Sequence, residues 1–391
     1  MQFSRYCRRM IGRPEDEARL QSALGRSPVV VLSGPRQVGK STLARMVVDP
    51  PRANTFDLED PRDLSRLGDP TLTLSGLEGT VVIDEAQHRG DLFPILRVLV
   101  DEDRRPGRFL VLGSASPDLI GLASESLAGR VTVLELPGLR LDDVGVSHLD
   151  QLWLRGGLPL SYLAASDQLS AQWRDDYVAT FLERDLGNLG VRVPATTMRR
   201  FWTMIAHYHG QYWNASELAR SLGVSRPTID RYLDALTDAL VVRQLQPWYA
   251  NLAKRQVRAP KVYVRDPGLL HRLLQITDRE DLLGHPKAGA SWEGFIIEQF
   301  LAAAGVADPH FWATHSGAEI DLVFSRKHQR IGLEVKLSDH PRMTPSIRNA
   351  IADLELDLVL VVHAGADTYP LADRVTAVAA ADLLSGSMAD F

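Results

Sequence analysis

The stretch Ser33-Gly34-Pro35-Arg36-Gln37-Val38-Gly39-Lys40-Ser41-Thr42 decides the fold of the amino-terminal part of this chain of 391 residues. It fits the pattern G-x-x-x-x-G-K-[ST], follows the apolar run 28–32, and precedes residues 42–48, which can continue as a helix. A strand, a glycine-containing loop and a helix start are together typical of a phosphate-binding loop. A glycine turn beside a surface lysine is the alternative, and the preceding strand disfavours it.

The loop has a physical reason to hold phosphates. Gly34 and Gly39 let the backbone turn so that successive N–H groups face an anion, and the helix that begins at Lys40 adds its positive dipole end. We expect Lys40 to reach the β- and γ-phosphates of ATP, and the Ser41 hydroxyl to ligate Mg²⁺. The residues expected to bind the nucleotide are Gly34, Pro35, Arg36, Gln37, Val38, Gly39, Lys40, Ser41, Thr42 and Asp84.

A second motif, residues 80–87, is a run of β-forming residues that ends in two carboxylates. Asp84 at the strand end would hold Mg²⁺ together with Ser41, and Glu85 would orient and deprotonate the attacking water. An acidic strand end without function is the alternative, and the phosphate loop earlier in the chain disfavours it.

Two further residues are candidates for contact with the γ-phosphate. Strand 109–116 ends in small polar residues, so Ser114 could bond the water or the phosphate, or simply cap the strand. Arg130, before strand 131–136, could sense the phosphate or act as a finger toward a neighbouring subunit, and a surface arginine is the alternative. Strands that alternate with helices predict a parallel sheet with the nucleotide at its carboxyl edge.

These motifs resemble the AAA+ ATPases, specifically a prokaryotic group with a carboxy-terminal domain of unknown function. The resemblance spans nearly the whole chain and is carried by residues 34–42, 81–87, 112–116, 127–130, 177–185, 212–249 and 319–336. It implies an α/β fold: a P-loop AAA+-type ATPase domain at 1–140, a helical region with a winged helix at 141–284, and a restriction-endonuclease-like domain at 285–391. Ser114 departs from the asparagine that is common in this superfamily, and no second sensor arginine is identified.

Residues 212–250 predict a winged helix-turn-helix. Asn214 is a helix N-cap with Glu217 three residues later, Gly223 ends this helix, and a second helix follows over 228–239. A β-like segment, 240–245, completes the pattern. If this module binds DNA, the residues expected to face the major groove are Arg226, Thr228, Arg231 and Tyr232.

A basic stretch without Asp or Glu covers residues 239–265 and contains aromatic side chains between its charges. This composition suits a nucleic-acid backbone. Its basic residues are Arg243, Lys254, Arg255, Arg258, Lys261 and Arg265. Docking to a protein partner is the alternative, because three aspartates also lie on the second helix.

The carboxy-terminal region predicts a hairpin of strands 319–324 and 331–337. In a symmetric hairpin Asp321 lies opposite Glu334, Glu319 lies opposite Lys336, and all four share one face. On helix 291–301, Glu293 falls within the apolar arc, where a carboxylate needs a partner or a metal, whereas Glu298 on the same helix points away.

These residues resemble the motif of the PD-(D/E)xK nucleases. The resemblance implies that Asp321 and Glu334 bind Mg²⁺ through oxygen ligands, that Glu293 completes the site, and that Lys336 activates the attacking water. A hairpin with a Glu319–Lys336 salt bridge, and a nuclease fold that no longer cuts, are the alternatives.

Composition limits the classes of protein to which the chain can belong. The net charge of −5 argues against a uniformly basic nucleic-acid coat, and Cys7, the single cysteine, excludes an internal disulfide. We expect a cytoplasmic protein without membrane contact, since no apolar run is long enough to cross a bilayer.

The combined prediction is an ATPase with ATP and Mg²⁺ as cofactors that acts on DNA, with branched or single-stranded DNA among the candidate targets and a homo-oligomer as a further candidate assembly. A signalling NTPase that controls a protein partner, and a metal-dependent nuclease regulated by ATP, are the alternatives.

Overall fold

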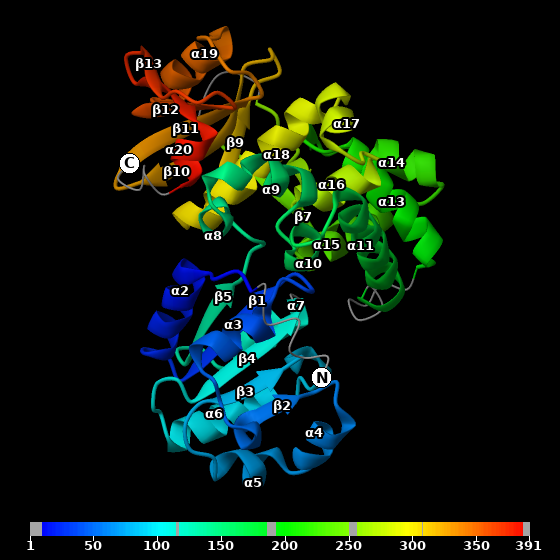
Figure 1. Cartoon of the computed structure of the whole chain (residues 1–391), viewed down its shortest axis with the longest axis vertical. Helices are drawn as coiled ribbons and strands as arrows, with labels where there is room; N and C mark the ends of the chain where they lie inside the picture. The colour runs from blue at the N-terminus through cyan, green and yellow to red at the C-terminus, as the bar shows by residue number, and fades with distance from the viewer. Residues whose placement is uncertain (1–9, 115–116, 186–192, 250–255, 307, 386–391) are drawn as a thin grey trace. The chain divides into compact units, whose positions relative to one another are not determined.

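The computed structural model describes residues 10–114, 117–185, 193–249, 256–306 and 308–385, and it divides into two compact units (Figure 1). The first unit is Met1–Gly138 together with Asp238–Leu240, and the second is Leu139–Thr237 together with Val241–Phe391. The segments 141–284 and 285–391 thus lie almost entirely in the second unit.

The first unit is built on a parallel sheet of five strands in the order β2-β3-β4-β1-β5. This confirms the predicted parallel sheet. The strands are β1 (Val29–Gly34), β2 (Thr55–Asp57), β3 (Val81–Asp84), β4 (Phe109–Ser114) and β5 (Val131–Glu135). The helices are α2 (Pro14–Leu24), α3 (Lys40–Val47), α4 (Pro61–Arg66), α5 (Pro70–Ser75), α6 (Leu92–Glu102) and α7 (Pro117–Ser126), with short 3₁₀ turns at Arg52–Asn54 and Ala86–His88.

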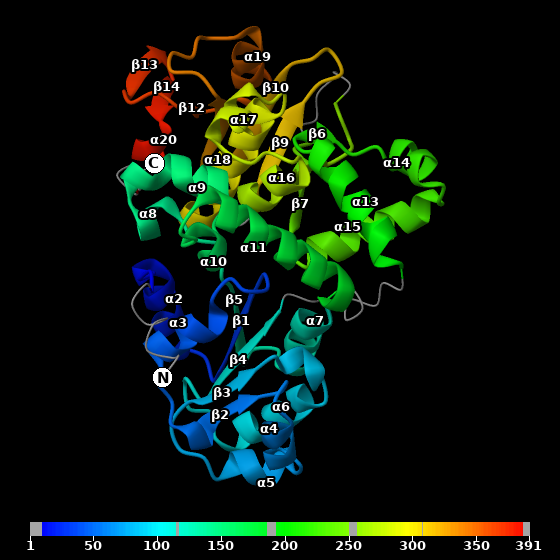
Figure 2. The ribbon, with the colours of Figure 1, turned by 45° about the vertical axis from the view of Figure 1, so that its right-hand side comes forward.

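Helices cover both faces of this sheet, which explains why its central strands are continuous apolar runs. Val29 and Val31 of β1 belong to a core that includes buried residues of α6 and α7, while α2 and α3 contact β1 and lie on the other side of the sheet (Figure 2). All six residues of β1 are buried. The burial fixes the strand that leads into the phosphate loop.

The second unit begins with helices. They are α8 (Leu141–Val144), α9 (Leu149–Arg155), α10 (Pro159–Tyr162), α11 (Asp167–Thr180), α13 (Ala195–His207), α16 (Pro267–Leu273) and α17 (Arg279–Gly284), with a 3₁₀ turn at Val146–His148 and a π-helical turn at Phe181–Asp185. The predicted helix around residues 173–186 is α11 with its π-helical turn, and Tyr177 and Phe181 of its apolar stripe are buried.

A helix pair and a hairpin follow α13. The elements are β6 (Gln211–Tyr212), α14 (Ala215–Leu222), α15 (Arg226–Asp238), β7 (Val242–Pro247) and β8 (Lys261–Val264). The predicted caps of α14 are confirmed: the Asn214 side chain accepts a hydrogen bond from the Glu217 N–H, and Gly223 has the left-handed φ of 70°. Strand β8 pairs antiparallel with both β6 and β7.

These strands continue into a sheet of nine strands, in the order β13-β14-β12-β11-β10-β9-β7-β8-β6. The additional strands are β9 (His310–Ala313), β10 (Glu319–Arg326), β11 (Gln329–Lys336), β12 (Leu358–His363), β13 (Tyr369–Ala372) and β14 (Val375–Ala379), with helices α18 (Ala288–Ala304), α19 (Pro345–Leu354) and α20 (Ala380–Leu384). Because β7 pairs with β9, the middle and carboxy-terminal segments share one sheet.

The β10–β11 hairpin has the predicted symmetric register, since Leu322 pairs with Leu333 and Arg326 with Gln329. Its two faces are covered by different helices. Ile320 and Val323 belong to the core under α19, while Phe324 contacts Phe300 of α18, with 5.2 Å between ring centroids.

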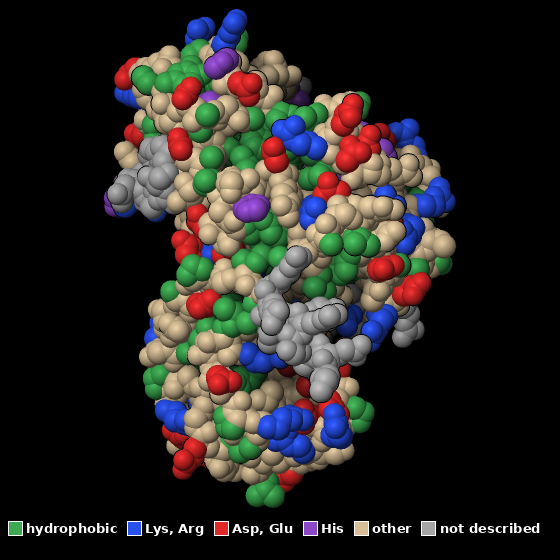
Figure 3. All heavy atoms as spheres, viewed as in Figure 1, with side chains coloured by type: hydrophobic (Ala, Val, Ile, Leu, Met, Phe, Trp, Pro, Cys, Tyr) green, Lys and Arg blue, Asp and Glu red, His purple; other side chains and the backbone are tan. Residues whose placement is uncertain are grey.

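The surface carries both signs of charge. On the face shown in Figure 3, Lys and Arg side chains are interspersed with Asp and Glu on both units. Among the described residues, no helix has the length and apolar character required to cross a membrane.

Candidate functional site

The phosphate loop joins β1 to α3, and its geometry depends on two glycines. A Cβ atom at Gly34 would lie 2.6 Å from the Leu136 carbonyl oxygen, so a larger residue would displace the loop or strand end. Gly39, the residue before α3, has a φ of 102°, which L side chains rarely adopt. Both positions therefore require glycine, as the sequence pattern predicted.

Lys40 holds its charge at the centre of this loop. Its side chain is buried, and Nζ donates to the carbonyl oxygens of Gly34 and Pro35 at 3.1 Å each. Burial lowers the pKa of Lys40, while the nearby carboxylates of Glu85 and Asp84 oppose this shift. Among the described residues, the hydrogen-bond partners of the ammonium are these two backbone oxygens, which phosphate oxygens could replace.

Ser41 and Asp84 are brought together as predicted. The Ser41 hydroxyl donates to Oδ2 of Asp84 at 2.6 Å, and Oδ1 of Asp84 accepts the Glu85 N–H at 2.9 Å. Burial raises the pKa of Asp84. A hydroxyl and a desolvated carboxylate in contact are oxygen ligands of the kind that Mg²⁺ prefers, so this pair fits the ion.

Glu85 lies directly after β3 in a left-handed conformation, with a φ of 55°. Non-glycine residues in this region are often found at functional sites. Its Oε2 accepts a hydrogen bond from Nε2 of Gln87 at 2.5 Å, and ligand atoms of Glu59, Glu85 and His88 lie within 4.8 Å of one another. The proximity of Gln87, Glu59 and His88 to Glu85 was not predicted from the sequence, although Gln87 and His88 follow Glu85 within three residues.

Ser114 lies beside the loop. In the sheet β4 separates β1 from β3, and Ser114 pairs with Gly34. The residue is therefore next to the loop and on the strand between it and Asp84, where the prediction placed it.

Arg130 is not close to the phosphate loop, which corrects the prediction that it senses the γ-phosphate within its own subunit. It precedes β5, whose first residue, Val131, pairs with Val29 at the start of β1. Arg130 therefore lies at the amino edge of the sheet, roughly 20 Å from the loop at 3.3 Å per residue. Its guanidinium forms an ion pair with Asp101 at 2.7 Å.

In the second unit, carboxylates converge on one lysine. Glu293 comes from α18, Glu319 and Asp321 from β10, and oxygen atoms of the three lie within 4.8 Å of one another. The Lys261 side chain of β8 is 3 % exposed, and its Nζ lies 3.0 Å from Oε1 of Glu293, 3.4 Å from Oδ1 of Asp321, and in contact with Oε1 of Glu319. We call these four residues the carboxylate cluster.

Two tyrosines also donate hydrogen bonds to carboxylates of this cluster. Tyr263 donates to Oε1 of Glu293 at 2.6 Å, and Tyr212 donates to Oε2 of Glu319 at 2.7 Å. Burial alone would lower the pKa of Lys261, but the surrounding carboxylates, Glu293 first, outweigh this and raise that pKa well above its ordinary value. Lys261 is therefore charged, and sequence reasoning missed its role because it belongs to the basic stretch.

Glu334 and Lys336 lie at the border of the cluster. Lys336 Nζ donates to Oε1 of Glu334 at 2.6 Å, and Oδ2 of Asp321 accepts the Val335 N–H at 2.9 Å. Burial and neighbouring negative charge raise the pKa values of Asp321 and Glu334. Asp321 lies close enough to Glu334 and Lys336 for their charges to interact, but Lys336 pairs with Glu334 and not with Glu319 as in the salt-bridge alternative.

Three of the six basic residues of the stretch form ion pairs within the unit, so these three do not offer free charge to a nucleic acid. Arg243 Nη2 and Arg265 Nε both donate to Oε2 of Glu298, at 3.0 and 2.9 Å, and Lys261 is buried in the cluster. Glu298 was expected to point away from the core, yet its side chain is 12 % exposed. Arg258 is exposed, and Lys254 and Arg255 lie outside the described residues.

The four predicted DNA-contacting residues of α15 lie in its first two turns, and Tyr232 is buried against Phe201, with 5.6 Å between ring centroids, which corrects its assignment to the groove. Arg226 is exposed, with Nε 3.7 Å from Oδ2 of Asp230, and Arg231 is also exposed. Thr228 is half-buried, and its hydroxyl bonds the Ser225 hydroxyl at 2.8 Å.

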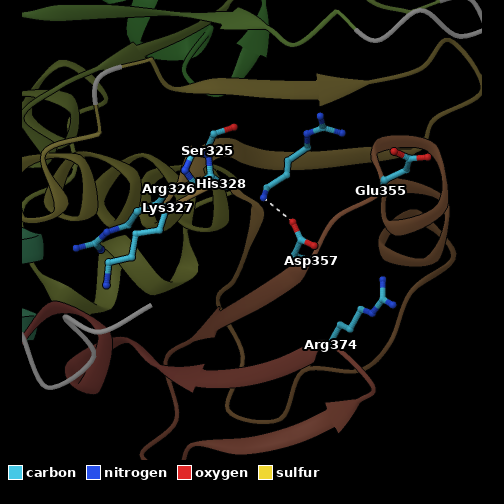
Figure 4. A pocket seen from close by; sticks show the side chains of 8 residues that line it. Ser325, Arg326, Lys327, His328, Glu355, Asp357 and Arg374 are labelled. Atoms are coloured by element: carbon cyan, nitrogen blue, oxygen red, sulfur yellow. Dashed lines mark hydrogen bonds between the residues drawn. The ribbon is translucent and has the colours of Figure 1, made fainter.

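An open polar cavity of about 620 Å³ lies at the turn end of the β10–β11 hairpin (Figure 4), so the length of the hairpin separates it from the carboxylate cluster. Its polar side chains come from three turns, and within it the backbone N–H of Arg330 donates to Oδ2 of Asp357 at 2.8 Å. The lining residues are Ser325, Arg326, Lys327, His328, Arg330, Glu355, Asp357 and Arg374.

Comparison with protein families divides the chain into three segments. Residues 26–144 match an AAA domain, residues 146–280 match a domain of unknown function (DUF8612), and residues 288–383 match another domain of unknown function (DUF4143).

Two mycobacterial proteins are similar to nearly the whole chain. The uncharacterized proteins Rv2008c of Mycobacterium tuberculosis and Mb2031c of Mycobacterium bovis are each 56 % identical over 381 residues, which cover 97 % of this chain and 86 % of theirs. Among solved structures, the Walker-type ATPase PABY2304 of Pyrococcus abyssi is similar with a TM-score of 0.46 and 16 % identity, over 68 % of this chain and 96 % of that one.

Proposed function

The chain belongs to the family of these two mycobacterial proteins and has an AAA domain at its amino-terminal end, and we propose that it binds ATP with Mg²⁺ and hydrolyses it. The observation that carries this proposal is the 2.6 Å contact between the Ser41 hydroxyl and Asp84 beside the buried ammonium of Lys40. Lys40 and Ser41 follow β1, Asp84 ends β3, and β4 lies between these two strands. The three side chains therefore meet only in the folded sheet.

Each residue then has a distinct task. The backbone of residues 34–39 and the start of α3 would cradle the phosphates, and Lys40 would exchange its two carbonyl partners for phosphate oxygens. Ser41 and Asp84 would hold Mg²⁺, which when bound neutralises charge on the phosphates. Glu85 would orient the attacking water and accept its proton, with Ser114 close enough to the loop to assist.

The test of this proposal is Mg²⁺-dependent nucleotide binding. In wild-type protein Mg²⁺ should strengthen ATP binding, and Ser41→Ala should lose that gain because one ligand of the ion is removed. Ser65→Ala, an exposed serine of α4 whose hydroxyl bonds the Pro61 carbonyl, is the matched control. A wild-type protein that neither binds nor hydrolyses ATP would refute the proposal.

We further propose DNA as the target of the second unit. The order of α13, β6, α14, α15 and the β7–β8 hairpin is typical of a winged helix, in which the second helix of the pair enters a groove. On α15 this assigns base or phosphate contacts to Arg226, Thr228 and Arg231. The support is confined to this helix and the exposed Arg258, because Arg243, Lys261 and Arg265 are engaged within the unit.

The DNA proposal predicts a specific loss of binding. Arg231→Glu should weaken binding by about 1–3 kcal/mol and flatten its salt dependence. Arg279→Glu, which changes an exposed arginine of α17, is the control and should have little effect. Binding and ATP turnover should be measured with single-stranded, duplex and branched DNA. If none of these DNAs changes the rate of ATP turnover, the result would favour a signalling NTPase that controls a protein partner. The role of Arg130 as a finger in a homo-oligomer stays a prediction.

A metal-dependent nuclease site is the second candidate function, favoured by the hairpin register and by the contact of Lys336 with Glu334. In this hypothesis Asp321, Glu334 and Glu293 would ligate Mg²⁺ and Lys336 would orient water. Their oxygens are hard ligands of the right type. An ion would, however, share the cluster with the ammonium of Lys261.

A further inference from the structure

We propose that Lys261 is the resident cation of the carboxylate cluster and that it competes directly with divalent ions for this site. The inference concerns the site of the nuclease hypothesis and takes from it only the identity of the competing ion, because an ammonium that excludes the ion would leave that hypothesis without its metal in the wild-type chain. Lys261 lies on β8, outside the segment from Glu334 to Lys336 that resembles the nuclease motif.

The geometry of the cluster matches one ammonium ion. A lysine has three N–H donors, and Nζ of Lys261 has three carboxylate neighbours: Glu293 at 3.0 Å, Asp321 at 3.4 Å and Glu319 in closer contact. One carboxylate oxygen from each of the same three residues lies within 4.8 Å of the others, an arrangement that could hold a metal ion. One position therefore suits either cation.

The two cations cannot share this position. A divalent ion bound to these oxygens at 2.0–2.6 Å would lie only about 3–4 Å from Nζ, and like charges at this separation repel strongly in a buried site. The ammonium would have to withdraw, and its exit is restricted. Strand β8 is paired on both sides, by β6 and β7, and Nζ also lies 5.8 Å from the centre of the Phe311 ring.

The cluster nevertheless keeps an excess of acidic groups. Two ammonium groups, those of Lys261 and the half-exposed Lys336, face four carboxylates, those of Glu293, Glu319, Asp321 and Glu334. Oε2 of Glu334 is buried and, among the described residues, has no hydrogen-bond partner. If the Lys261 charge were removed, buried oxygen ligands would remain without a counter-cation. The structure therefore predicts that a divalent ion enters when the ammonium is absent.

The experiment is Mn²⁺ binding by the full chain without nucleotide, followed by thermal melting and by electron paramagnetic resonance of free Mn²⁺. Lys261→Met removes the charge and keeps an apolar stem, and Lys327→Met, at the exposed turn of the β10–β11 hairpin, is the matched control. The second-unit transition of Lys261→Met should rise by roughly 5–10 °C at a hundredfold excess of Mn²⁺ over its Kd. Wild type and Lys327→Met should show no rise. The rise seen in Lys261→Met should be abolished when Asp321→Asn is added to it.

Three results would overturn the proposal. A wild-type transition that rises with Mn²⁺ and loses this response in Asp321→Asn would show that Lys261 does not exclude the ion. A folded Lys261→Met chain that ignores Mn²⁺ would show that the oxygens do not form a cation site. If Lys261→Met is unfolded without metal, Mn²⁺ should restore its fold, and a chain that stays unfolded would contradict the proposal.

The same samples separate this inference from the proposed functions. Mn²⁺ uptake by Lys261→Met without cleavage of DNA would support the competition and reject the nuclease hypothesis. ATP turnover, which depends on Lys40 and Glu85 of the first unit, is scored independently in each sample.

Discussion

Glu85→Gln should bind ATP with nearly wild-type affinity and hydrolyse it about 10²–10⁴-fold more slowly, because an amide cannot accept the proton of the attacking water. The substitution preserves size and the hydrogen-bond acceptor for Gln87, which donates to Oε2 of Glu85 at 2.5 Å. The left-handed backbone at residue 85 is equally open to Glu and Gln. The measurement is single-turnover ATP hydrolysis beside equilibrium ATP binding.

Glu59→Gln is the matched control for this prediction. Glu59 is exposed, it lies within 4.8 Å of Glu85 through its carboxylate oxygen, and it forms an ion pair with Arg36 at 3.4 Å. Its change should leave most of the turnover intact. If Glu59→Gln stopped hydrolysis and Glu85→Gln did not, the base would be assigned to the wrong carboxylate.

The nucleotide site could be predicted from the sequence because its residues lie in short segments at the carboxyl ends of parallel strands. Lys40 and Ser41 follow β1, Asp84 and Glu85 end or follow β3, and Ser114 ends β4 between them. Such strand ends meet at one edge of the sheet whatever the lengths of the connections. Local pattern and topology therefore gave the same answer.

Arg130 shows the limit of that argument. The residue precedes its strand, so the same parallel topology places it at the amino edge, away from the loop. Its motif resembled a functional one, but the direction of β5 decides its position. The ion pair with Asp101 of α6 joins segments that no local pattern connects.

The charges of the second unit could not be paired from the sequence, because their partners are distant along the chain. A run of basic residues near β7 and β8 predicts an exposed surface only if its carboxylate partners lie elsewhere. Here β7 and β8 join the same sheet as β9 and β10, so Lys261 meets Asp321 and Glu319, and Arg243 meets Glu298. Charge composition predicts a partner of opposite sign but does not say whether that partner is internal.

Glu298 supplies the largest expected effect on stability. Its carboxylate accepts hydrogen bonds from both Arg243 and Arg265, and all three side chains are largely buried. Glu298→Gln leaves two partly buried guanidinium groups without a counter-charge, which should lower the free energy of unfolding of the second unit by about 3–5 kcal/mol. Glu280→Gln on exposed α17 is the matched control and should change stability by less than about 0.5 kcal/mol.

The pH dependence of the same variant tests whether the loss comes from charge. Burial opposes ionisation of Glu298, but Arg243 and Arg265 outweigh it and lower the pKa from 4.5 to about 2. A carboxyl with a lowered folded-state pKa stabilises the fold above its unfolded-state pKa, and this contribution is lost as the pH falls toward the folded-state value. The difference in urea-unfolding free energy between wild type and Glu298→Gln should therefore be constant near neutral pH and shrink between about pH 4.5 and pH 2. A difference that does not change over this interval would mean that packing, and not the ion pairs with Arg243 and Arg265, accounts for the loss.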